Sequence, residues 1–243
     1  MLNTRGVSYG IDAPGVIRNL FIAAAATIIL PLIFPMVKIG AVIIDITWLM
    51  WMGLYLSLGG ALMLVYSLVG KFKHRERMLN MIAWRGDEQV LDIGTGKGLL
   101  MIGAAKKLTT GKATGIDIWN EKDLTGNNIE NAFKNAAIEG VKDKIEIRNE
   151  NAMNMSFTDN SFDVILSNLC LHNISDKEGR FAACKEISRV LKRGGTGVIA
   201  DFMHTKEYKR NFDKLGMQTT VCPVSYFSTF YFPPLRMLVT RKA

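Results

Sequence analysis

Three glycines at alternate positions, preceded by an aspartate, form the stretch of this sequence best suited to holding a small molecule. The run Val90-Leu91-Asp92-Ile93 is apolar and β-branched apart from the aspartate, which is typical of a buried parallel strand. Gly94, Gly96 and Gly98 follow, and without a Cβ the backbone turns sharply and approaches a ligand closely. Helical periodicity begins at Leu99, so the first helical amides are expected to be available to a carboxylate or another polar group.

An acidic residue stands at the end of the next predicted strand. Asp117 lies about twenty residues beyond the glycine turn, where an acid accepts hydrogen bonds from both hydroxyls of a ribose. The glycine spacing is G-x-G-x-G, and Leu99 stands where the G-x-G-x-x-G pattern of dinucleotide sites has its last glycine. The spacing therefore predicts an adenosine-containing ligand and matches nicotinamide dinucleotides less well.

From residue 75 onward, short apolar strands alternate with amphipathic helices. This alternation predicts a parallel sheet with helices on both faces and a ligand at the carboxyl ends of the strands. The predicted strands are 89–93, 112–118, 144–148, 161–168, 196–202, 217–223 and 236–240, and the predicted helices are 75–84, 99–108, 124–139, 177–191 and 207–215.

Residues 86–243 resemble the class I S-adenosylmethionine-dependent methyltransferases along their whole length. The segment from Asp92 to Gly98 resembles the first motif of that family, D-x-G-x-G-x-G, and Asp117 resembles its ribose-binding acid. Phe162-Asp163-Val164-Ile165 is similar to the fourth-strand motif, and Leu191-Lys192-Arg193-Gly194-Gly195 to the turn before the fifth strand. The resemblance implies an α/β, Rossmann-like, seven-stranded and mostly parallel sheet with a reversed terminal hairpin, and S-adenosyl-L-methionine as cofactor.

The resemblance also implies which residues bind that cofactor. The family commonly has an acid at position 151 that accepts from the adenine amino group, and the carbonyl of Asn151 can accept the same bond. Trp119 either stacks on adenine or covers the second helix. Asn168 either reaches the methionine part of the cofactor or the acceptor, or caps its strand. The expected cofactor-binding residues are Asp92, Gly94, Thr95, Gly96, Gly98, Asp117, Ile118, Trp119, Asn151, Ala152 and Asn168.

Two histidines are candidates for acid–base chemistry. S-adenosylmethionine carries its own electrophile, a sulfonium methyl group, so such an enzyme mainly aligns a nucleophile and excludes water. A base helps where the acceptor must lose a proton. His172 and His204 each follow the carboxyl end of a predicted strand. The alternatives are a hydrogen-bonded residue at a helix start for His172 and a loop residue for His204.

Composition argues against several other classes of protein. The net charge is +8, but the basic residues are scattered and form no stripe interleaved with aromatics, so we expect no nucleic-acid partner. Cys170, Cys184 and Cys222 form no C-x-x-C pair and are typical of buried cysteines in a reducing compartment. The three histidines lack ligand spacing, so no metal site is expected.

The first 70 residues predict a membrane anchor, and residues 71–243 the methyltransferase domain. Residues from about 17–37 and 46–70 form two apolar runs long enough to span a bilayer as helices. A signal peptide and a buried core hairpin are the alternatives. The cluster from Lys71 to Arg77 follows the second run, so the positive-inside rule places the catalytic domain in the cytoplasm. Residues 1–15 are expected to form a loose arm or an interfacial segment.

The aromatic segment Tyr226–Leu235 is expected to form an interfacial surface or an apolar acceptor pocket. Together these patterns predict methyl transfer to a small acceptor that is hydrophobic or associated with the membrane. Two alternatives stay open. One is a catalytically idle, membrane-tethered module that binds S-adenosylmethionine. The other is a nicotinamide-dependent oxidoreductase, for which no Tyr-x-x-x-Lys pair is present.

Overall fold

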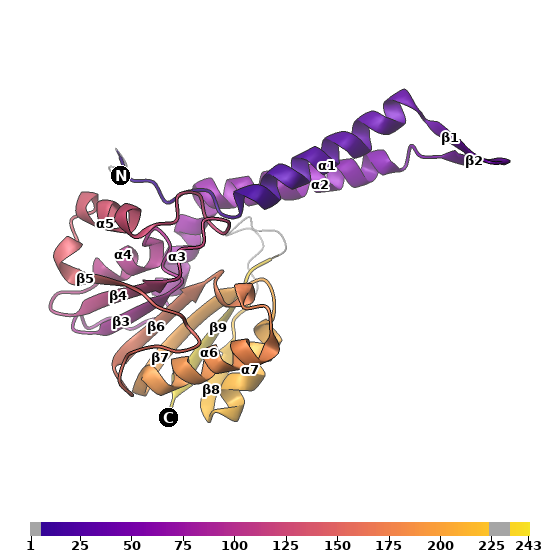
Figure 1. Cartoon of the computed structure of the whole chain (residues 1–243). Helices are drawn as coiled ribbons and strands as arrows, with labels where there is room; N and C mark the ends of the chain where they lie inside the picture. Colours follow the sequence, from indigo (N-terminus) through magenta and orange to yellow (C-terminus); the bar gives the residue numbers. More distant parts are fainter. Residues whose placement is uncertain (1–5, 224–233) are drawn as a thin grey trace.

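The main body of the protein is a seven-stranded sheet with the strand order β5-β4-β3-β6-β7-β9-β8 (Figure 1). The structure, a computed structural model, describes residues 6–223 and 234–243. Strand β9 runs antiparallel to β7 and β8, whereas the pairs among β5, β4, β3, β6 and β7 are parallel. The expected Rossmann-like sheet with a reversed strand in its terminal hairpin is confirmed.

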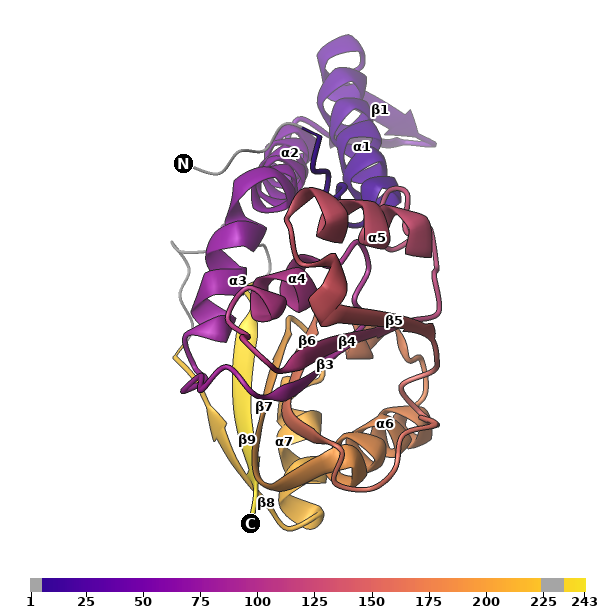
Figure 2. The ribbon, with the colours of Figure 1, turned by 90° about the vertical axis from the view of Figure 1, so that its left-hand side faces the viewer.

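Helices cover both faces of this sheet. Helices α3, α4 and α5 lie on one face, and α6 and α7 lie on the other (Figure 2). The strands are β3 (Gln89–Ile93), β4 (Lys112–Asp117), β5 (Ile145–Asn149), β6 (Phe162–Asn168), β7 (Leu191–Asp201), β8 (Met217–Val221) and β9 (Arg236–Lys242). The helices are α3 (Lys71–Leu79), α4 (Leu99–Ala105), α5 (Ile129–Ile138), α6 (Lys177–Val190) and α7 (Thr205–Lys214), with 3₁₀ turns at Lys142–Lys144 and Leu171–Asn173.

Each face of the sheet has its own hydrophobic core. Successive side chains of a strand point to opposite faces, so Val90 of β3 belongs to the core under α4 while Leu91 belongs to the core under α6 and α7. Both side chains are fully buried. A strand buried on both faces must be apolar throughout, which is why the run before Gly94 is recognisable in the sequence.

Helix boundaries differ most from the sequence-based expectation at α5 and α3, and the helix expected over 99–108 ends at Ala105. The helix expected over 124–139 begins only at Ile129, because the Asn128 side chain accepts a hydrogen bond from the Asn131 amide and caps the helix. The helix expected over 75–84 ends at Leu79 and begins at Lys71, where it continues directly from the N-terminal segment. Local capping and helix continuity are weak signals in the sequence.

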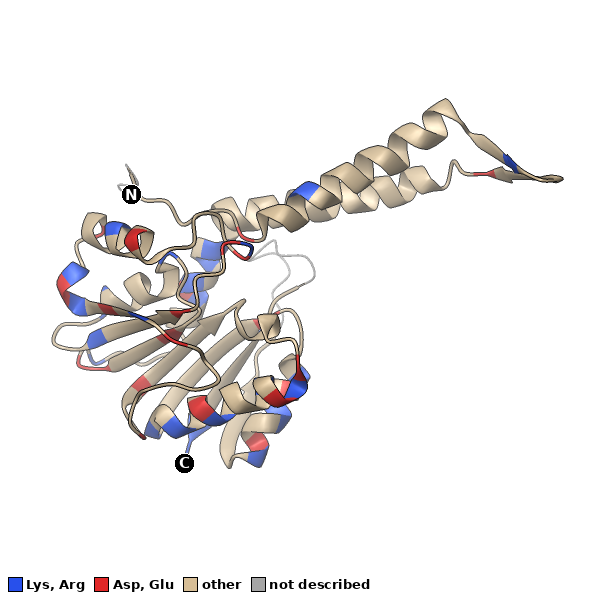
Figure 3. Cartoon of the chain, viewed as in Figure 1, with Lys and Arg blue, Asp and Glu red and all other residues tan. Residues whose placement is uncertain are grey.

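The N-terminal segment forms a helical hairpin that projects away from the sheet. Helix α1 (Pro14–Ile33) leads into a small β-hairpin of β1 (Met36–Ile39) and β2 (Val42–Asp45), and α2 (Leu49–Val65) returns. A π-helical turn, Tyr66–Gly70, joins α2 to α3. Helix α1 and the continuous helix Leu49–Leu79 are both long and apolar enough to cross a membrane. Figure 3 shows that the hairpin carries almost no charge, in contrast to the sheet domain.

Residues 6–13 are packed against the domain, so the expectation of a loose arm is wrong for this part of the chain. Tyr9 is buried, and its hydroxyl donates to Glu139 Oε1 over 3.0 Å. The buried Lys71 ammonium donates to the carbonyls of Tyr9 and Gly10 over 2.8 and 2.6 Å, and pairs with Asp12 at 3.2 Å. A buried ammonium needs several acceptors, and the arm supplies them.

Candidate active site

A cavity of about 800 Å³ lies at the carboxyl ends of the central strands. Its walls include Gly94 after β3, Asp117 at the end of β4, Asn151 after β5 and Asn168 at the end of β6. It also reaches the base of the α1–α2 hairpin. Small-molecule sites usually measure about 300–1,000 Å³, so this cavity has room for a cofactor and an acceptor together. A second cavity of about 70 Å³ adjoins the glycine turn.

The glycine turn exposes backbone to the main cavity. Gly94 has a φ of 74°, and a Cβ there would lie 2.4 Å from Cys170 Sγ. Gly96 has a φ of 52°, and its Cβ would lie 2.9 Å from a methyl group of Leu124. Both conformations favour glycine, as the sequence indicated. Gly98 is also left-handed but precedes α4 outside the main cavity.

Asp92 supports the turn from behind. Its Oδ2 accepts from Thr95 Oγ1 and from the Met101 amide, both over 2.9 Å. One amide at the start of α4 is therefore capped by the protein itself, contrary to the expectation that these amides are available to a ligand. Asp92 and Thr95 line only the smaller cavity. Burial raises the pKa of Asp92 to about 7.

Asp117 faces the main cavity and is held in place by two backbone amides. Gly96 N donates to its Oδ2 and Trp119 N to its Oδ1, each over 2.8 Å. A carboxylate has further lone pairs, so it retains acceptors for a ribose. Ile118 also lines the cavity and is 64 % exposed. The Trp119 side chain instead packs on the core under α4, so it corresponds to the alternative of a covering residue.

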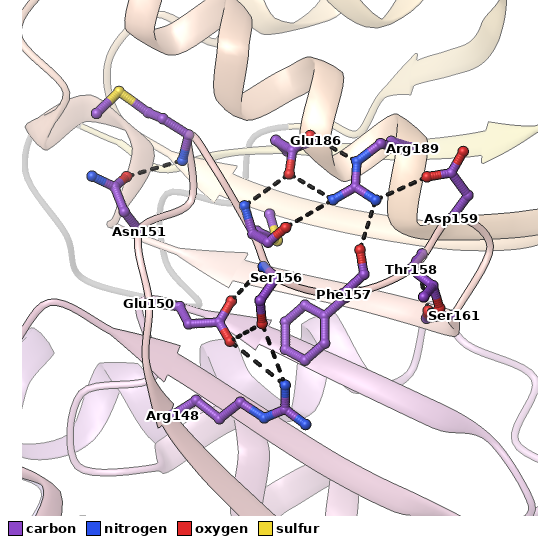
Figure 4. Close-up of polar contacts among 12 residues, drawn as sticks. Arg148, Glu150, Asn151, Ser156, Phe157, Thr158, Asp159, Ser161, Glu186 and Arg189 are labelled. Atoms are coloured by element: carbon purple, nitrogen blue, oxygen red, sulfur yellow. Dashed lines mark hydrogen bonds and ion pairs between the residues drawn. The ribbon is translucent and has the colours of Figure 1, made fainter.

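Asn151 and Ala152 begin a loop that is fixed by charged side chains (Figure 4). Asn151 Oδ1 accepts from the Met153 amide over 2.9 Å, which leaves one of its lone pairs for an adenine amino group. Arg189 of α6 donates to the carbonyls of Phe157 and Met155 over 2.7 and 3.0 Å. Sequence analysis missed Arg189, because its partners lie more than thirty residues away and the spacing follows no motif.

A buried amide oxygen on the cavity wall fits the polar groups of S-adenosylmethionine. Asn168 is held by the Tyr66 hydroxyl, to which its Nδ2 donates over 3.1 Å, and by His74, whereas Asn127 Oδ1 has no hydrogen-bond partner within the described part of the chain. A buried acceptor of this kind requires a donor. The ammonium group and the ribose hydroxyls of the cofactor are donors of the right type, so Asn127 fits it.

His172 is the predicted histidine that reaches the cavity. Its Nδ1 lies 2.9 Å from Oδ1 of the fully buried Asp201, although the two atoms are not aligned as a hydrogen bond in this conformation. Asp201 Oδ2 also accepts from the His172 amide over 3.1 Å. Phe202 packs edge-on against the imidazole, with ring centroids 4.7 Å apart. The carboxylate at the end of β7 thus holds both the backbone and the ring of His172, a pairing that the sequence analysis did not identify.

His204 does not line the cavity. It caps α7 with a φ of 56°, and its carbonyl accepts from the amides of Glu207 and Tyr208. Its Nδ1 lies 3.6 Å from Glu207 Oε2. This placement corresponds to the structural alternative.

Cys170, Cys184 and Cys222 are free, and within residues 6–223 and 234–243 no cluster of three His, Cys, Asp or Glu side chains could hold a metal ion. Of the aromatic segment Tyr226–Leu235, residues 226–233 lie outside the described residues.

Comparisons with known proteins match this geometry. The family described as "Methyltransferase domain" matches residues 85–225, more than half of the chain. A demethylmenaquinone methyltransferase of Tropheryma whipplei is 32 % identical over 155 residues, which are 64 % of this chain and 59 % of that protein. A sterol 24-C-methyltransferase of Gibberella zeae is 33 % identical over 138 residues, 56 % of this chain and 33 % of that protein. The chain thus spans well under two thirds of the length of these relatives.

Solved structures show the same fold at low sequence identity. A SAM-dependent methyltransferase from Aquifex aeolicus superposes with a TM-score of 0.55 at 18 % identity, covering 71 % of this chain and 92 % of that one. Geranyl diphosphate C-methyltransferase from Streptomyces coelicolor, solved with S-adenosyl-L-homocysteine, gives 0.56 at 13 % identity, covering 71 % and 79 %. The chain therefore belongs to the methyltransferase domain family, with the class I fold and S-adenosyl-L-methionine as its cofactor.

Proposed function

We propose that this protein transfers a methyl group from S-adenosylmethionine to a small apolar acceptor dissolved in, or associated with, a membrane. The observation that carries the proposal is one cavity that joins the glycine turn, Asp117 and His172 to the base of a helical hairpin whose two helices carry a single charged residue, Arg18. Relatives named for demethylmenaquinone and for a sterol are consistent with an apolar acceptor. The family match includes the glycine turn, which removes the support for a nicotinamide-dependent oxidoreductase.

The cofactor residues divide by the part of the cofactor that they would hold. Asp117 would bind the ribose hydroxyls, and Gly94 and Gly96 leave the backbone open beside them. Ile118 and the Asn151-Ala152 pair would contact the adenine. Asn168, which lines the cavity, would contact the methionine part of the cofactor. When bound, the cofactor supplies an electrophilic methyl group on a sulfonium.

His172 would act as the general base. Because Asp201 lies at Nδ1, the proton of neutral imidazole stays on that nitrogen and Nε2 is left to accept a proton from the acceptor. Asp201 is a positioning residue in this scheme, since it holds the ring and does not line the cavity. Positioned bases typically contribute about 10²–10⁴-fold to rate.

The hairpin would make the protein a two-span membrane protein with its catalytic domain in the cytoplasm. Lys71 and Arg75 of the basic cluster are buried in the domain, which leaves Lys73 and Arg77 as the more accessible cations at this end. At the far end Lys38 and Asp45 cancel in charge. The remaining excess of positive charge favours the domain side as cytoplasmic.

The test is methyl transfer from labelled S-adenosylmethionine in vesicles that contain the full chain and a total lipid extract. We expect label in the organic phase, and none there with the Asp117→Ala variant. Label confined to water-soluble products would contradict an apolar acceptor. No label in either phase, with cofactor binding intact, would favour the catalytically idle module.

A further inference from the structure

The main cavity extends past the strand ends into the base of the helical hairpin. The apolar lining of this extension consists of Val16 and Leu20 of α1 and Tyr55, Leu56, Gly59 and Met63 of α2. Residues three or four apart on a helix share one side, so Tyr55, Leu56, Gly59 and Met63 form a lane along α2. From Tyr55 to Met63, eight steps along the helix, the lane rises roughly 12 Å at 1.5 Å per residue.

The outward faces of the same helices are exposed and apolar. Ile22 is 61 % exposed, Trp51 76 % and Leu58 59 %. Arg18 is the one charged residue of α1, and α2 has none. An apolar surface of this extent suits the hydrocarbon of a bilayer. The lane along α2 therefore lies beside a surface that suits acyl chains.

The two helices are in close contact at Gly60, which lies within the length of the lane, and at Gly53, which lies farther from the sheet domain. A Cβ at Gly53 would lie 2.5 Å from Ile28 Cγ1, and one at Gly60 would lie 3.1 Å from the Phe21 ring. Small residues at such contacts let helix backbones approach each other. A chain leaving the cavity is therefore directed sideways along the lane, because no gap between α1 and α2 is left at these contacts.

The polar lining of the cavity is rich in carboxylates. Among the described residues the cavity is lined by Lys122 as the one lysine or arginine and by five acidic residues: Asp12, Asp117, Asp123, Asp176 and Glu150. Asp12 and Asp123 lie at the base of the hairpin, where Asp12 pairs with the Lys71 ammonium at 3.2 Å. Carboxylates repel a phosphate or another anion at short range. The charge of this lining favours an acceptor whose head is neutral or cationic.

We propose that the α1–α2 hairpin is the tail-binding subsite for the acceptor, which enters sideways from the bilayer. The acceptor is an amphiphile with a neutral or cationic head at His172 and an apolar tail along Tyr55, Leu56, Gly59 and Met63. This inference rests on the proposed function, because that function is what makes the occupant of the subsite the methyl acceptor. The hairpin is then part of the binding site as well as an anchor.

The experiment compares Leu56→Trp, which fills the lane, with Leu58→Trp, the same change on the exposed face of the same helix. The full chain is placed in phosphatidylcholine nanodiscs with S-adenosylhomocysteine. The probe is radiolabelled 4-dodecylphenol, a neutral head with an apolar tail, and retention by empty nanodiscs is subtracted. Dodecyl phosphate is the anionic comparison. Calorimetric binding of S-adenosylhomocysteine reports that each variant is folded.

We expect Leu56→Trp to weaken dodecylphenol binding at least tenfold and Leu58→Trp to change it less than twofold. With the unaltered chain, dodecyl phosphate should bind more weakly than dodecylphenol. Should Leu56→Trp fail to fold, Leu56→Ala against Leu58→Ala replaces the pair, and only the first should weaken binding. Equal probe binding by both members of the pair would overturn the inference. If the probe binds in the lane but receives no methyl group once S-adenosylmethionine replaces S-adenosylhomocysteine, the subsite would be supported and the proposed function would be contradicted.

Discussion

Individual residues of the site either face the cavity or hold those that do. Asp117 does both, since it lines the cavity and accepts from the Gly96 amide. Asp92 and Asp201 are fully buried and orient the glycine turn and His172 respectively. Replacing a cavity residue should therefore change binding or turnover alone, whereas replacing a supporting residue should also change stability.

His172→Gln should lower methyl transfer by about 10²–10⁴-fold while leaving S-adenosylhomocysteine affinity unchanged, because the base is lost and the cofactor contacts remain. The measurement is turnover together with calorimetric binding on the same preparation. His204→Gln is the matched control and should keep full activity, since His204 caps α7 outside the cavity. Full activity of His172→Gln would contradict the assignment of the base.

Asp92 should make the stability of the protein depend on pH. The pKa of its carboxyl is about 7 in the fold and about 3.9 in an unfolded chain. The folded state therefore binds the extra proton between these values, and the stability that Asp92 contributes falls as pH rises from about 4 to about 7 and is level above. A shift of this size corresponds to about 4 kcal/mol.

Asp92→Asn keeps an acceptor for Thr95 and Met101 but carries no charge. In thermal unfolding without cofactor, we expect this variant to have a higher melting temperature than the unaltered protein at pH 8. The difference between the two melting temperatures should be smaller at pH 4.5. Asp143→Asn, at an exposed position, should show no such difference. A difference in melting temperature that is the same at both pH values would argue against a destabilising charge at Asp92.

At the scale of elements, loops and strand ends bring the site together. The loop from Asn151 to Ser161 carries the expected adenine contacts, and α6 holds it through Arg189 and Glu186. Glu186 Oε2 accepts from the Met155 amide and from Arg189, and Arg189 also donates to the carbonyls of Met155 and Phe157. Three backbone groups and two side chains of opposite charge thus form one network (Figure 4). The adenine side of the site thus depends on a helix that does not touch the cavity.

Arg189→Met should destabilise the protein by about 2–3 kcal/mol, because charged hydrogen bonds to buried carbonyls are lost. The melting temperature should fall by several degrees, and S-adenosylhomocysteine should bind several-fold more weakly as the loop loosens. Arg193→Met, at an exposed position after α6, is the control and should stay within about 0.5 kcal/mol. An unchanged melting temperature for Arg189→Met would mean that the loop is held by other contacts.

The sheet and the glycine turn were predictable from the sequence because their signals are local. Buried parallel strands are apolar throughout, and Gly94 and Gly96 occupy left-handed conformations that other residues rarely adopt. The pairing of His172 with Asp201 was not predictable, since it joins residues 29 apart across two strands. The sequence left the orientation of Trp119 open for a related reason: whether a side chain after a strand faces the ligand or the core depends on packing, which residue type does not specify.

At the scale of the whole molecule, buried polar contacts join the hairpin to the sheet domain. Tyr66, between α2 and α3, is fully buried and accepts from Asn168 of the cavity wall. Lys71 ties residues 9–12 to the start of α3. The expected boundary between the anchor, residues 1–70, and the domain, residues 71–243, therefore separates residues that are in contact with each other.

A chain that begins at Lys71 should melt at a lower temperature than the full chain and bind S-adenosylhomocysteine more weakly. It lacks Tyr9, Asp12 and Tyr66, and it leaves a buried ammonium without acceptors. Replacing residues 36–45 at the hairpin tip by a short glycine-serine turn is the control and should leave both quantities unchanged. Equal stability of the 71–243 chain would show that the two parts fold independently.

The central claim is that a carboxylate beside an open glycine turn holds an adenosyl cofactor. Its most direct test is a calorimetric titration of the full chain with S-adenosylhomocysteine, repeated with Asp117→Ala and with NADH as titrant. The account predicts saturable binding by the unaltered chain, binding at least about a hundredfold weaker for Asp117→Ala, since charged hydrogen bonds contribute about 1.5–3 kcal/mol each, and no saturable binding of NADH. Undiminished affinity of Asp117→Ala, or binding of NADH in place of S-adenosylhomocysteine, would contradict it.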